Sequence, residues 1–243
     1  MSIRPSHLGA ITLCLWAASA HAAFHVMQIE EVIGGVNGNS NAQAIQLRLR
    51  IAGQNVVSAA RLKVYDRNGL NPVLLLDITS DVANSAAGAN ILLATPAFNT
   101  IMAAAAGYAP DFTLTNTIPV SYLSGGKVTF EDDFGTIYWA LAFGNYTGTN
   151  DGDGTNTNGF TGNFGAPFSS ALPTAGVQAI AFKGTAAAGS ASNSTDYGIV
   201  NSPTVRRNNG STFSVIPEPG AVAFLGAGTV ALGALIFSRR RKA

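Results

Sequence analysis

The chain has 243 residues and a formal net charge of +1, and only 11% of its residues are charged. A chain this close to neutral gives no electrostatic reason to expect a nucleic acid as partner. Its single cysteine, Cys14, excludes an internal disulfide framework and a metal site built from several cysteines.

Residues 1–22 have the three regions of a secretory signal peptide. Arg4 supplies a positive start, residues 8–16 form an apolar run, and Ala20-His21-Ala22 fits the small-residue cleavage pattern. The apolar run is too short for a retained membrane anchor. We therefore expect a signal-peptide helix that is removed by cleavage directly after this motif.

The next segment alternates between apolar and polar residues as β-strands do. Strands are expected at 24–33, 44–51, 61–66 and 72–78, with a glycine- and asparagine-rich loop at 34–41. The second strand alternates most regularly, with one apolar and one polar face: Ile45, Leu47, Leu49 and Ile51 against Gln46, Arg48 and Arg50. This period predicts a half-buried strand of an antiparallel sheet.

The first two strands also resemble a known family. Ile29-Glu30-Glu31-Val32, followed after the loop by Ala44-Ile45-Gln46-Leu47-Arg48, resembles the lamin-tail-like immunoglobulin sandwich domains of exported bacterial proteins. Gln46 stands where that family usually has glutamate. The resemblance covers about residues 24–78 and implies a β-sandwich with a binding or scaffolding role and no reaction.

One helix is expected near the middle of the chain, at 95–107. Thr95 can cap its start, Pro96 suits its first turn and Gly107 can end it. Its apolar residues recur at the helical spacing i, i+3, i+4, i+7: Phe98, Ile101, Met102 and Ala105. We interpret this stripe as packing against the sandwich rather than as a ligand site.

A hairpin is expected from strands at 127–131 and 136–143, joined by a turn at 132–135. Beside this turn lies the densest acidic cluster of the chain: Glu131, Asp132 and Asp133. Paired carboxylates can catalyse glycoside hydrolysis, but aspartates are also the residues that such a turn prefers. We interpret the cluster as a solvated turn. Tyr138 and Trp139 fall on opposite faces of the second strand, so one of them should be buried.

Glycine, asparagine and threonine dominate residues 144–176, which we expect to form a long loop. A strand at 177–182, a second loop at 184–193 and a last strand at 212–216 follow. Neither loop is expected to contribute to the core.

The long loop contains the most calcium-like feature of the chain, Asp151-Gly152-Asp153-Gly154. Oxygen ligands at alternate positions, with glycines between them, suit calcium. An EF-hand that starts at Asp151 fails at its fifth, sixth and twelfth positions, which are Thr155, Asn156 and Gly162. Asp151 and Asp153 are therefore a candidate calcium site, with a solvated loop as the favoured interpretation.

His25 is the only histidine outside the signal peptide. One histidine without partners makes no metal site, and a Ser-His-Asp triad would have to depend on it. We expect His25 to be a strand residue, and we expect the domain to have no catalytic residues.

Residues 215–243 contain three features in a fixed order. Pro217-Glu218-Pro219 comes first, and an uncharged apolar run of 18 residues follows at 220–237. A basic cluster then ends the chain: Arg239, Arg240, Arg241 and Lys242. The run is near the short end of what spans a bilayer, and the basic cluster predicts a single transmembrane helix with the N-terminal domain outside.

This order resembles the PEP-CTERM sorting signal, which occurs on exported proteins of Gram-negative bacteria that make extracellular polysaccharide. The resemblance implies that Pro217, Glu218 and Pro219 are recognised by exosortase, a membrane transpeptidase-like sorting enzyme. It implies that the helix and basic tail are a sorting device, either kept as an anchor or removed after sorting. It implies nothing about the domain between the two signals.

Without the two signals, about residues 23–216 remain. Arg4 and the basic cluster hold five of the 14 basic residues and Glu218 is one of the 13 acidic ones, which leaves a net charge of −3. We expect an all-β, immunoglobulin-like antiparallel sandwich at 23–214, with one short helix and a non-enzymatic binding or structural role at the cell surface or in the polysaccharide matrix. The alternatives are a carbohydrate-active hydrolase that uses carboxylates and a calcium-dependent adhesin. Calcium in that adhesin is the only cofactor considered.

Overall fold

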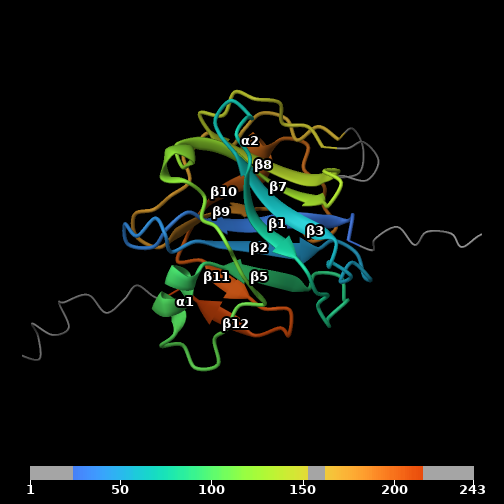
Figure 1. Ribbon diagram of the computed structural model, residues 1–243, viewed down its shortest axis with the longest axis vertical. Helices are drawn as coiled ribbons and strands as arrows, with labels where there is room; N and C mark the ends of the chain where they lie inside the picture. Colours follow the sequence, from blue (N-terminus) through green and yellow to red (C-terminus); the bar gives the residue numbers. More distant parts are fainter. Residues whose placement is uncertain (1–23, 153–161, 216–243) are drawn as a thin grey trace, which may run out of the picture.

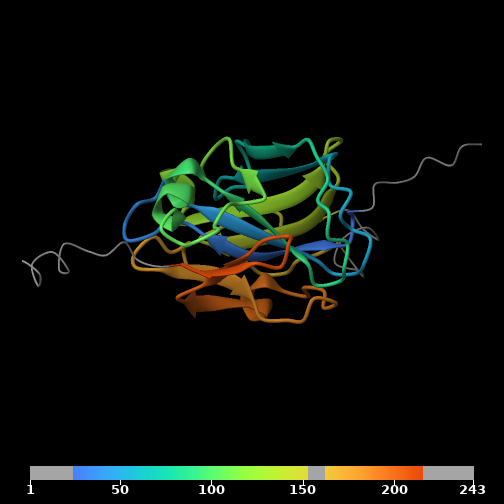
Figure 2. The ribbon, with the colours of Figure 1, turned by 90° about the horizontal axis from the view of Figure 1, so that it is seen from below.

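Two β-sheets pack face to face around the main core (Figures 1 and 2). The computed structural model describes residues 24–152 and 162–215. One sheet has six strands in the order β10 (Tyr197–Asn201), β9 (Gln178–Phe182), β1 (Met27–Ile33), β2 (Ala44–Leu49), β5 (Asn90–Ala94) and β6 (Phe112–Thr113). The other has four, in the order β4 (Val73–Ile78), β3 (Ala60–Tyr65), β7 (Gly125–Asp132) and β8 (Ile137–Gly144). A separate hairpin consists of β11 (Thr204–Arg206) and β12 (Thr212–Ser214).

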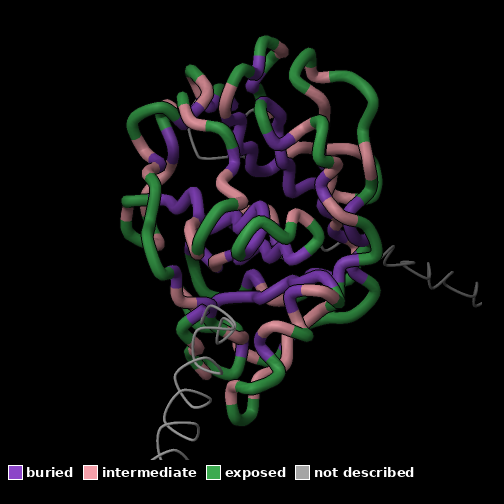
Figure 3. The backbone as a smooth tube through the Cα atoms, turned by 90° about the vertical axis from the view of Figure 1, so that its left-hand side faces the viewer, coloured by how far each residue is buried: buried purple, intermediate pink, exposed green. Residues whose placement is uncertain are grey.

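The main core lies between the two sheets, and Figure 3 shows buried residues gathered in the interior with exposed residues along the outside. Trp139 of β8 is fully buried at its centre and packs edge-on against Phe182, with ring centroids 5.6 Å apart. Its Nε1 donates a hydrogen bond to the Tyr197 hydroxyl at 2.7 Å, and that hydroxyl donates to the Ile29 carbonyl at 2.6 Å. This chain of bonds satisfies the polar atoms of both rings and links the two sheets.

The second face of the six-stranded sheet is covered as well. Helix α1 (Pro96–Met102) and the β11–β12 hairpin lie next to β5 (Figure 1) and share a smaller apolar cluster with it. The predicted half-buried character of β2 is therefore wrong, because Gln46, on the polar face, is only 2% exposed. Ile51, predicted to face the core, is 48% exposed because the strand ends at Leu49.

The predicted helix is confirmed at its start and is shorter than predicted at its end. The Phe98 amide donates to Thr95 Oγ1 at 3.2 Å, so Thr95 is the cap and Pro96 the first helical residue. Phe98 and Met102 are buried in the smaller cluster, as predicted. The helix ends at Met102 rather than at Gly107, whose φ of +76° places it in a later turn. Two further short helical elements are the 3-10 turn η1 (Val120–Tyr122) and the one-turn helix α2 (Asn193–Asp196).

The fold is all-β, as predicted, but the strands are not all antiparallel. Strands β5 and β6 run parallel, with Leu93 opposite Phe112. The sequence prediction lacks β5, β6, β10 and β11. All five residues of β5 are buried, so its sequence shows no alternation. One of Tyr138 and Trp139 is predicted to be buried, and the structure buries both, because Phe24 packs edge-on over Tyr138 with ring centroids 5.5 Å apart.

The two loops do contribute buried residues, contrary to the prediction. Phe164 in the first loop is fully buried against Trp139, and the loop pairs with the edge of β8 through the Phe168 amide and the Ala142 carbonyl at 2.9 Å. Asn193, at the end of the second loop, is fully buried and accepts a hydrogen bond from the Ala142 amide at 2.9 Å. A strand edge needs such partners, and here polar loop residues supply them.

Several predicted features lie outside the described residues. They are the signal peptide at 1–22, the Pro217-Glu218-Pro219 motif, the transmembrane helix at 220–237 and the basic cluster. Over residues 24–152 and 162–215, no helix is long and apolar enough to cross a membrane.

Candidate functional site

A β-bulge in β1 brings two consecutive glutamates to one face of the six-stranded sheet. Ile29 lies opposite Leu47 of β2, but Glu31 lies opposite Gln46, so Glu30 is an extra residue in β1. Residues opposite each other share a face, which places Glu31 on the same face as Gln46. The Glu30 carboxylate reaches the same face, because Gln46 Nε2 donates to it at 2.9 Å. Strict alternation would place these two glutamates on opposite faces.

Glu30 is surrounded by donors. Arg48 Nη1 lies 2.9 Å and Arg206 Nη1 3.6 Å from its Oε1. Its Oε2 accepts hydrogen bonds from Gln46 Nε2 and from Asn90 Nδ2. With its side chain only 10% exposed, Glu30 is a buried carboxylate with each oxygen partnered.

Glu31 has the opposite environment. Its Oε1 is buried and has no hydrogen-bond partner among the residues that the structure describes. Burial, and secondarily the negative charge of Glu30, raise the pKa of Glu31 to about 8, although Arg206 counteracts the shift. A largely protonated acid beside an ionised one is the arrangement that general acid–base catalysis uses, and it is also found in structural networks.

The surroundings of this pair favour a structural role. Arg48 Nη2 donates to the Gly184 carbonyl at 2.9 Å, and Gln28 Nε2 donates to the Ala188 carbonyl at 3.4 Å. The Arg206 amide donates to Gln46 Oε1, which fastens the β11–β12 hairpin to the same face. The polar residues of β1 and β2 therefore hold the 184–188 loop and the hairpin onto the sheet.

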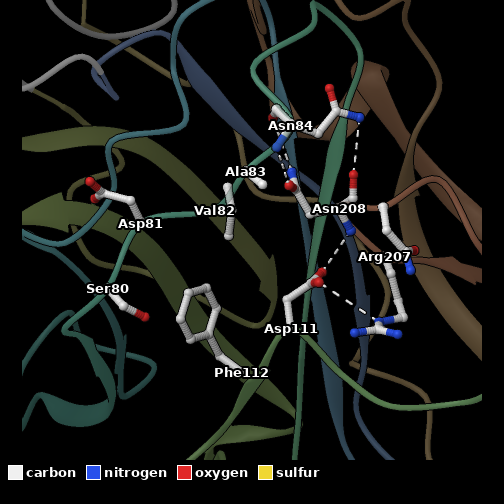
Figure 4. A pocket seen from close by; sticks show the side chains of 10 residues that line it. Ser80, Asp81, Val82, Ala83, Asn84, Asp111, Phe112, Arg207 and Asn208 are labelled. Carbon is white, nitrogen blue, oxygen red and sulfur yellow. Dashed lines mark hydrogen bonds and ion pairs between the residues drawn. The ribbon is translucent and has the colours of Figure 1, made fainter.

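A pocket of about 300 Å³ opens beside this network (Figure 4). Three segments line it: the loop at 80–84, Asp111 and Phe112 at the start of β6, and the turn at 207–209 that follows β11. Asp111 Oδ2 accepts hydrogen bonds from the amides of Leu92 and Asn208, both at 2.8 Å. Its Oδ1 lies 3.8 Å from Arg207 Nε. Burial raises the pKa of Asp111, against the lowering effect of these hydrogen bonds and of the Arg207 charge.

Two asparagines hold the walls of the pocket together. The backbone amide of Asn84 donates to Asn208 Oδ1 at 2.6 Å, and Asn208 Nδ2 donates back to the backbone carbonyl of Asn84 at 3.1 Å. Asn208 Nδ2 also reaches the Asn90 carbonyl at 3.1 Å, and the Asn90 side chain contacts Glu30. The pocket and the glutamate pair are thus connected by one hydrogen-bond network.

The structure divides the predicted acidic cluster. Glu131 is 1% exposed and lies within 2.9 Å of Arg61 Nε and 2.5 Å of Lys63 Nζ, so it is not part of a solvated turn. Asp132 does belong to the turn: its Oδ1 accepts from the amides of Phe134 and Thr136. Asp133 is exposed there, as predicted.

The structure shows no site at the two other candidates among the described residues, the calcium-like loop and His25. Asp151 is exposed and its backbone bridges to Asn163, while Asp153 lies outside the described residues. Within the described ranges, no three His, Cys, Asp or Glu side chains gather closely enough to hold a metal ion. The calcium site stays a prediction. His25 lies in the turn before β1 rather than in the strand, with its ring 6.3 Å from that of Tyr138.

Sequence reasoning does not find the pocket residues, because no local motif marks Asp111 or Arg207. The acidic pair is visible in the sequence, but the bulge that joins its two members is not. No protein-family model matches this chain, and no curated protein is significantly similar to it.

Proposed function

We propose that this chain is an exported cell-surface protein of a Gram-negative bacterium that acts by binding and not by catalysis. In this proposal an exosortase-type enzyme recognises Pro217-Glu218-Pro219, as the resemblance of the tail implies. The apolar run at 220–237 and the basic cluster hold the protein in the inner membrane, with its sandwich domain outside, until it is sorted to the surface or the matrix.

The packing of Phe24 and Val215, the first and last residues that the structure describes, carries this proposal. Phe24 is fully buried and packs edge-on against Phe130, with ring centroids 5.9 Å apart. Val215 is 3% exposed, and its amide donates to the Pro203 carbonyl at 3.0 Å. The predicted cleavage after Ala22 and the motif at 217–219 lie directly outside these two residues. Processing at both places would therefore keep every residue that the structure describes as buried.

The binding role is supported by how the buried acids are used. Glu131 is paired with two cations of the neighbouring strand β3, and Glu30 with donors from β2, β5 and β11, so both acids are occupied in joining strands. The pocket at Asp111 offers a site for a small ligand. Two sheets packed face to face also suit the lamin-tail-like, immunoglobulin-like sandwich that we propose for the domain. No cofactor is part of the proposal, and extracellular polysaccharide is the partner that we favour.

One observation favours a carboxylate-based hydrolase as second candidate, namely the protonated Glu31 beside Glu30. It ranks below the binding role because glycosidases place their two carboxyl groups on either side of the scissile bond. Here the two glutamates are neighbours in one strand, beneath the loop and the hairpin. Turnover of a glycoside by the protein, lost in Glu31→Gln, would reverse this ranking.

Fractionation of the native host tests the sorting proposal. We expect the wild-type protein at the cell surface or in the medium. A variant that combines Pro217→Ala, Glu218→Ala and Pro219→Ala should stay in the inner membrane. Asp133→Ala, which removes an exposed acid far from the motif in sequence, is the control and should be sorted normally. An equal distribution of the motif variant and the wild type would refute the proposal.

A further inference from the structure

The pocket beside β6 contains hydrogen-bonding capacity that the fold does not use. Arg207 Nε is buried and has no hydrogen-bond partner among the described residues, and Asp111 Oδ1 lies 3.8 Å from it. The two backbone hydrogen bonds that hold Asp111 both go to its Oδ2. A charged donor and a carboxylate oxygen thus lie side by side. A hydroxyl group fits this pair, since it can donate to Asp111 and accept from Arg207 at once.

The opposite side of the pocket contains its two larger apolar side chains, Phe112 and Val82, beside Ser80 and Asp81. Figure 4 shows the Phe112 ring and the Val82 side chain on one side of the pocket, with Asp111, Asn208 and Arg207 on the other. Phe112 is half-buried and packs against the main core, which fixes the position of its ring. A ligand with hydroxyl groups on its edge and C–H groups on its face matches both sides.

The charges in the pocket narrow the class of ligand. Two aspartates, Asp81 and Asp111, line the pocket against one arginine, Arg207, so a carboxylate or phosphate ligand is disfavoured. Two carboxylates are also few for calcium, which takes 6–8 oxygen ligands. The volume of about 300 Å³ lies at the low end of the range for small-molecule sites and suits one small ring rather than an extended chain.

We infer that this pocket binds one neutral saccharide unit, with Asp111 and Arg207 sharing a hydroxyl group and Phe112 contacting the face of the ring. The inference names the ligand class of the proposed binding function and rests on that function. The reciprocal bonds between Asn84 and Asn208 hold the walls in place before the ligand arrives, so little ordering is needed on binding.

The test is an NMR titration of the full chain in dodecylphosphocholine micelles, a detergent without a sugar headgroup. The ligands are methyl glycosides of glucose, galactose and mannose, N-acetylglucosamine and, as the charged counterpart, glucuronate. At least one neutral ligand should shift the amide signals of residues 80–84, 111–112 and 207–209 in a saturable way. Glucuronate should bind more weakly than glucose. A wild-type protein that shows no saturable shifts with any of the five ligands overturns the inference.

Arg207→Gln removes the charged donor and should weaken binding about tenfold, because a hydrogen bond to a charged group contributes on that order. Arg67→Gln, an identical change at an exposed arginine, is the matched control and should bind as the wild type does. Asp111→Asn should also weaken binding, and its melting temperature is compared with the wild type because Asp111 also holds Leu92 and Asn208. Equal affinity of Arg207→Gln and Arg67→Gln overturns the inference.

This test and the fractionation fail independently. A protein that reaches the surface but binds none of the five ligands overturns the saccharide site and leaves the proposed sorting intact. A protein that binds a neutral saccharide but stays in the inner membrane keeps the site and refutes the sorting.

Discussion

The two sheets solve the same electrostatic problem in different ways. On the outer face of the four-stranded sheet, Glu131 is nearly inaccessible but faces two cations, Arg61 and Lys63. On the second face of the six-stranded sheet, two acids, Glu30 and Glu31, share two cations. These are Arg48 and Arg206, and the Arg206 side chain is 47% exposed. Both cations point at Glu30, and Oε1 of Glu31 has no hydrogen-bond partner within the described residues. The comparison teaches that burial alone does not decide the state of a buried acid. An acid with cations directly beside it forms ion pairs, whereas an acid without them has a raised pKa.

The largest expected effect is at the compensated acid. Glu131→Gln should destabilise the protein by about 3 kcal/mol, because two cations lose their ion-pair partner. This value is at the low end of the range for breaking a buried ion pair, since both cations are partly exposed to water. Urea unfolding measures this loss, with Asp133→Asn at the exposed end of the same hairpin as the control. A loss no larger than that of the control would mean that the ion pairs contribute nothing to stability.

The uncompensated acid should behave in the opposite way. The pKa of Glu31 is raised to about 8 in the folded protein, so the folded state binds a proton that the unfolded state releases at about pH 4.3. Its contribution to stability is therefore complete below that lower value and is lost as the pH rises towards about 8. Glu31→Gln, which cannot release a proton, should be more stable than the wild type by several kcal/mol near pH 8 and by much less near pH 5, since each pKa unit corresponds to about 1.4 kcal/mol.

Unfolding experiments at the two pH values measure this difference. The stability difference between Glu31→Gln and the wild type is measured at both pH values. Any effect of the altered side-chain shape is the same at both and therefore cancels. The same stability difference near pH 5 and near pH 8 would contradict the assignment of a raised pKa to Glu31.

The smallest effect is expected at the outermost cation. Arg206→Gln removes an ion pair of 3.6 Å from a side chain that is 47% exposed, and should cost less than about 1 kcal/mol. It should also raise the pKa of Glu31 further, because Arg206 lowers it. Carboxyl NMR measures that pKa, and a fall on substitution would contradict the arrangement. Arg67→Gln, at an exposed arginine outside this network, is the control for both readouts.

The sequence predicts the regular parts of the fold because their signals are local. Alternation locates β2 and β3, and Thr95 with Pro96 locates the start of α1. It does not predict β5, whose residues are buried on both faces, or the buried Phe164, which is surrounded by residues typical of loops. Period-two reasoning fails for a further reason at Glu30, because one extra residue in the strand reverses the face of every residue after it.

The candidate pocket is less predictable than the fold. Asp111, Asn84 and Arg207 come from three separate segments, and only the arrangement of the sheet edge and the hairpin brings them together. Nothing in the spacing of these residues along the chain indicates that they share a site. The two proposed terminal signals are different again, since each is predicted from a contiguous sequence pattern that does not depend on the fold.

The central claim is that the protein is processed at both ends of its packed domain, and the most direct measurement is the intact mass of the protein isolated from its native host. The account predicts a chain that starts at Ala23 and ends at or next to Pro217-Glu218-Pro219, so that Phe24 and Val215 are both kept. A mass that includes the tail to Ala243, and does not change when the motif is replaced, would contradict it.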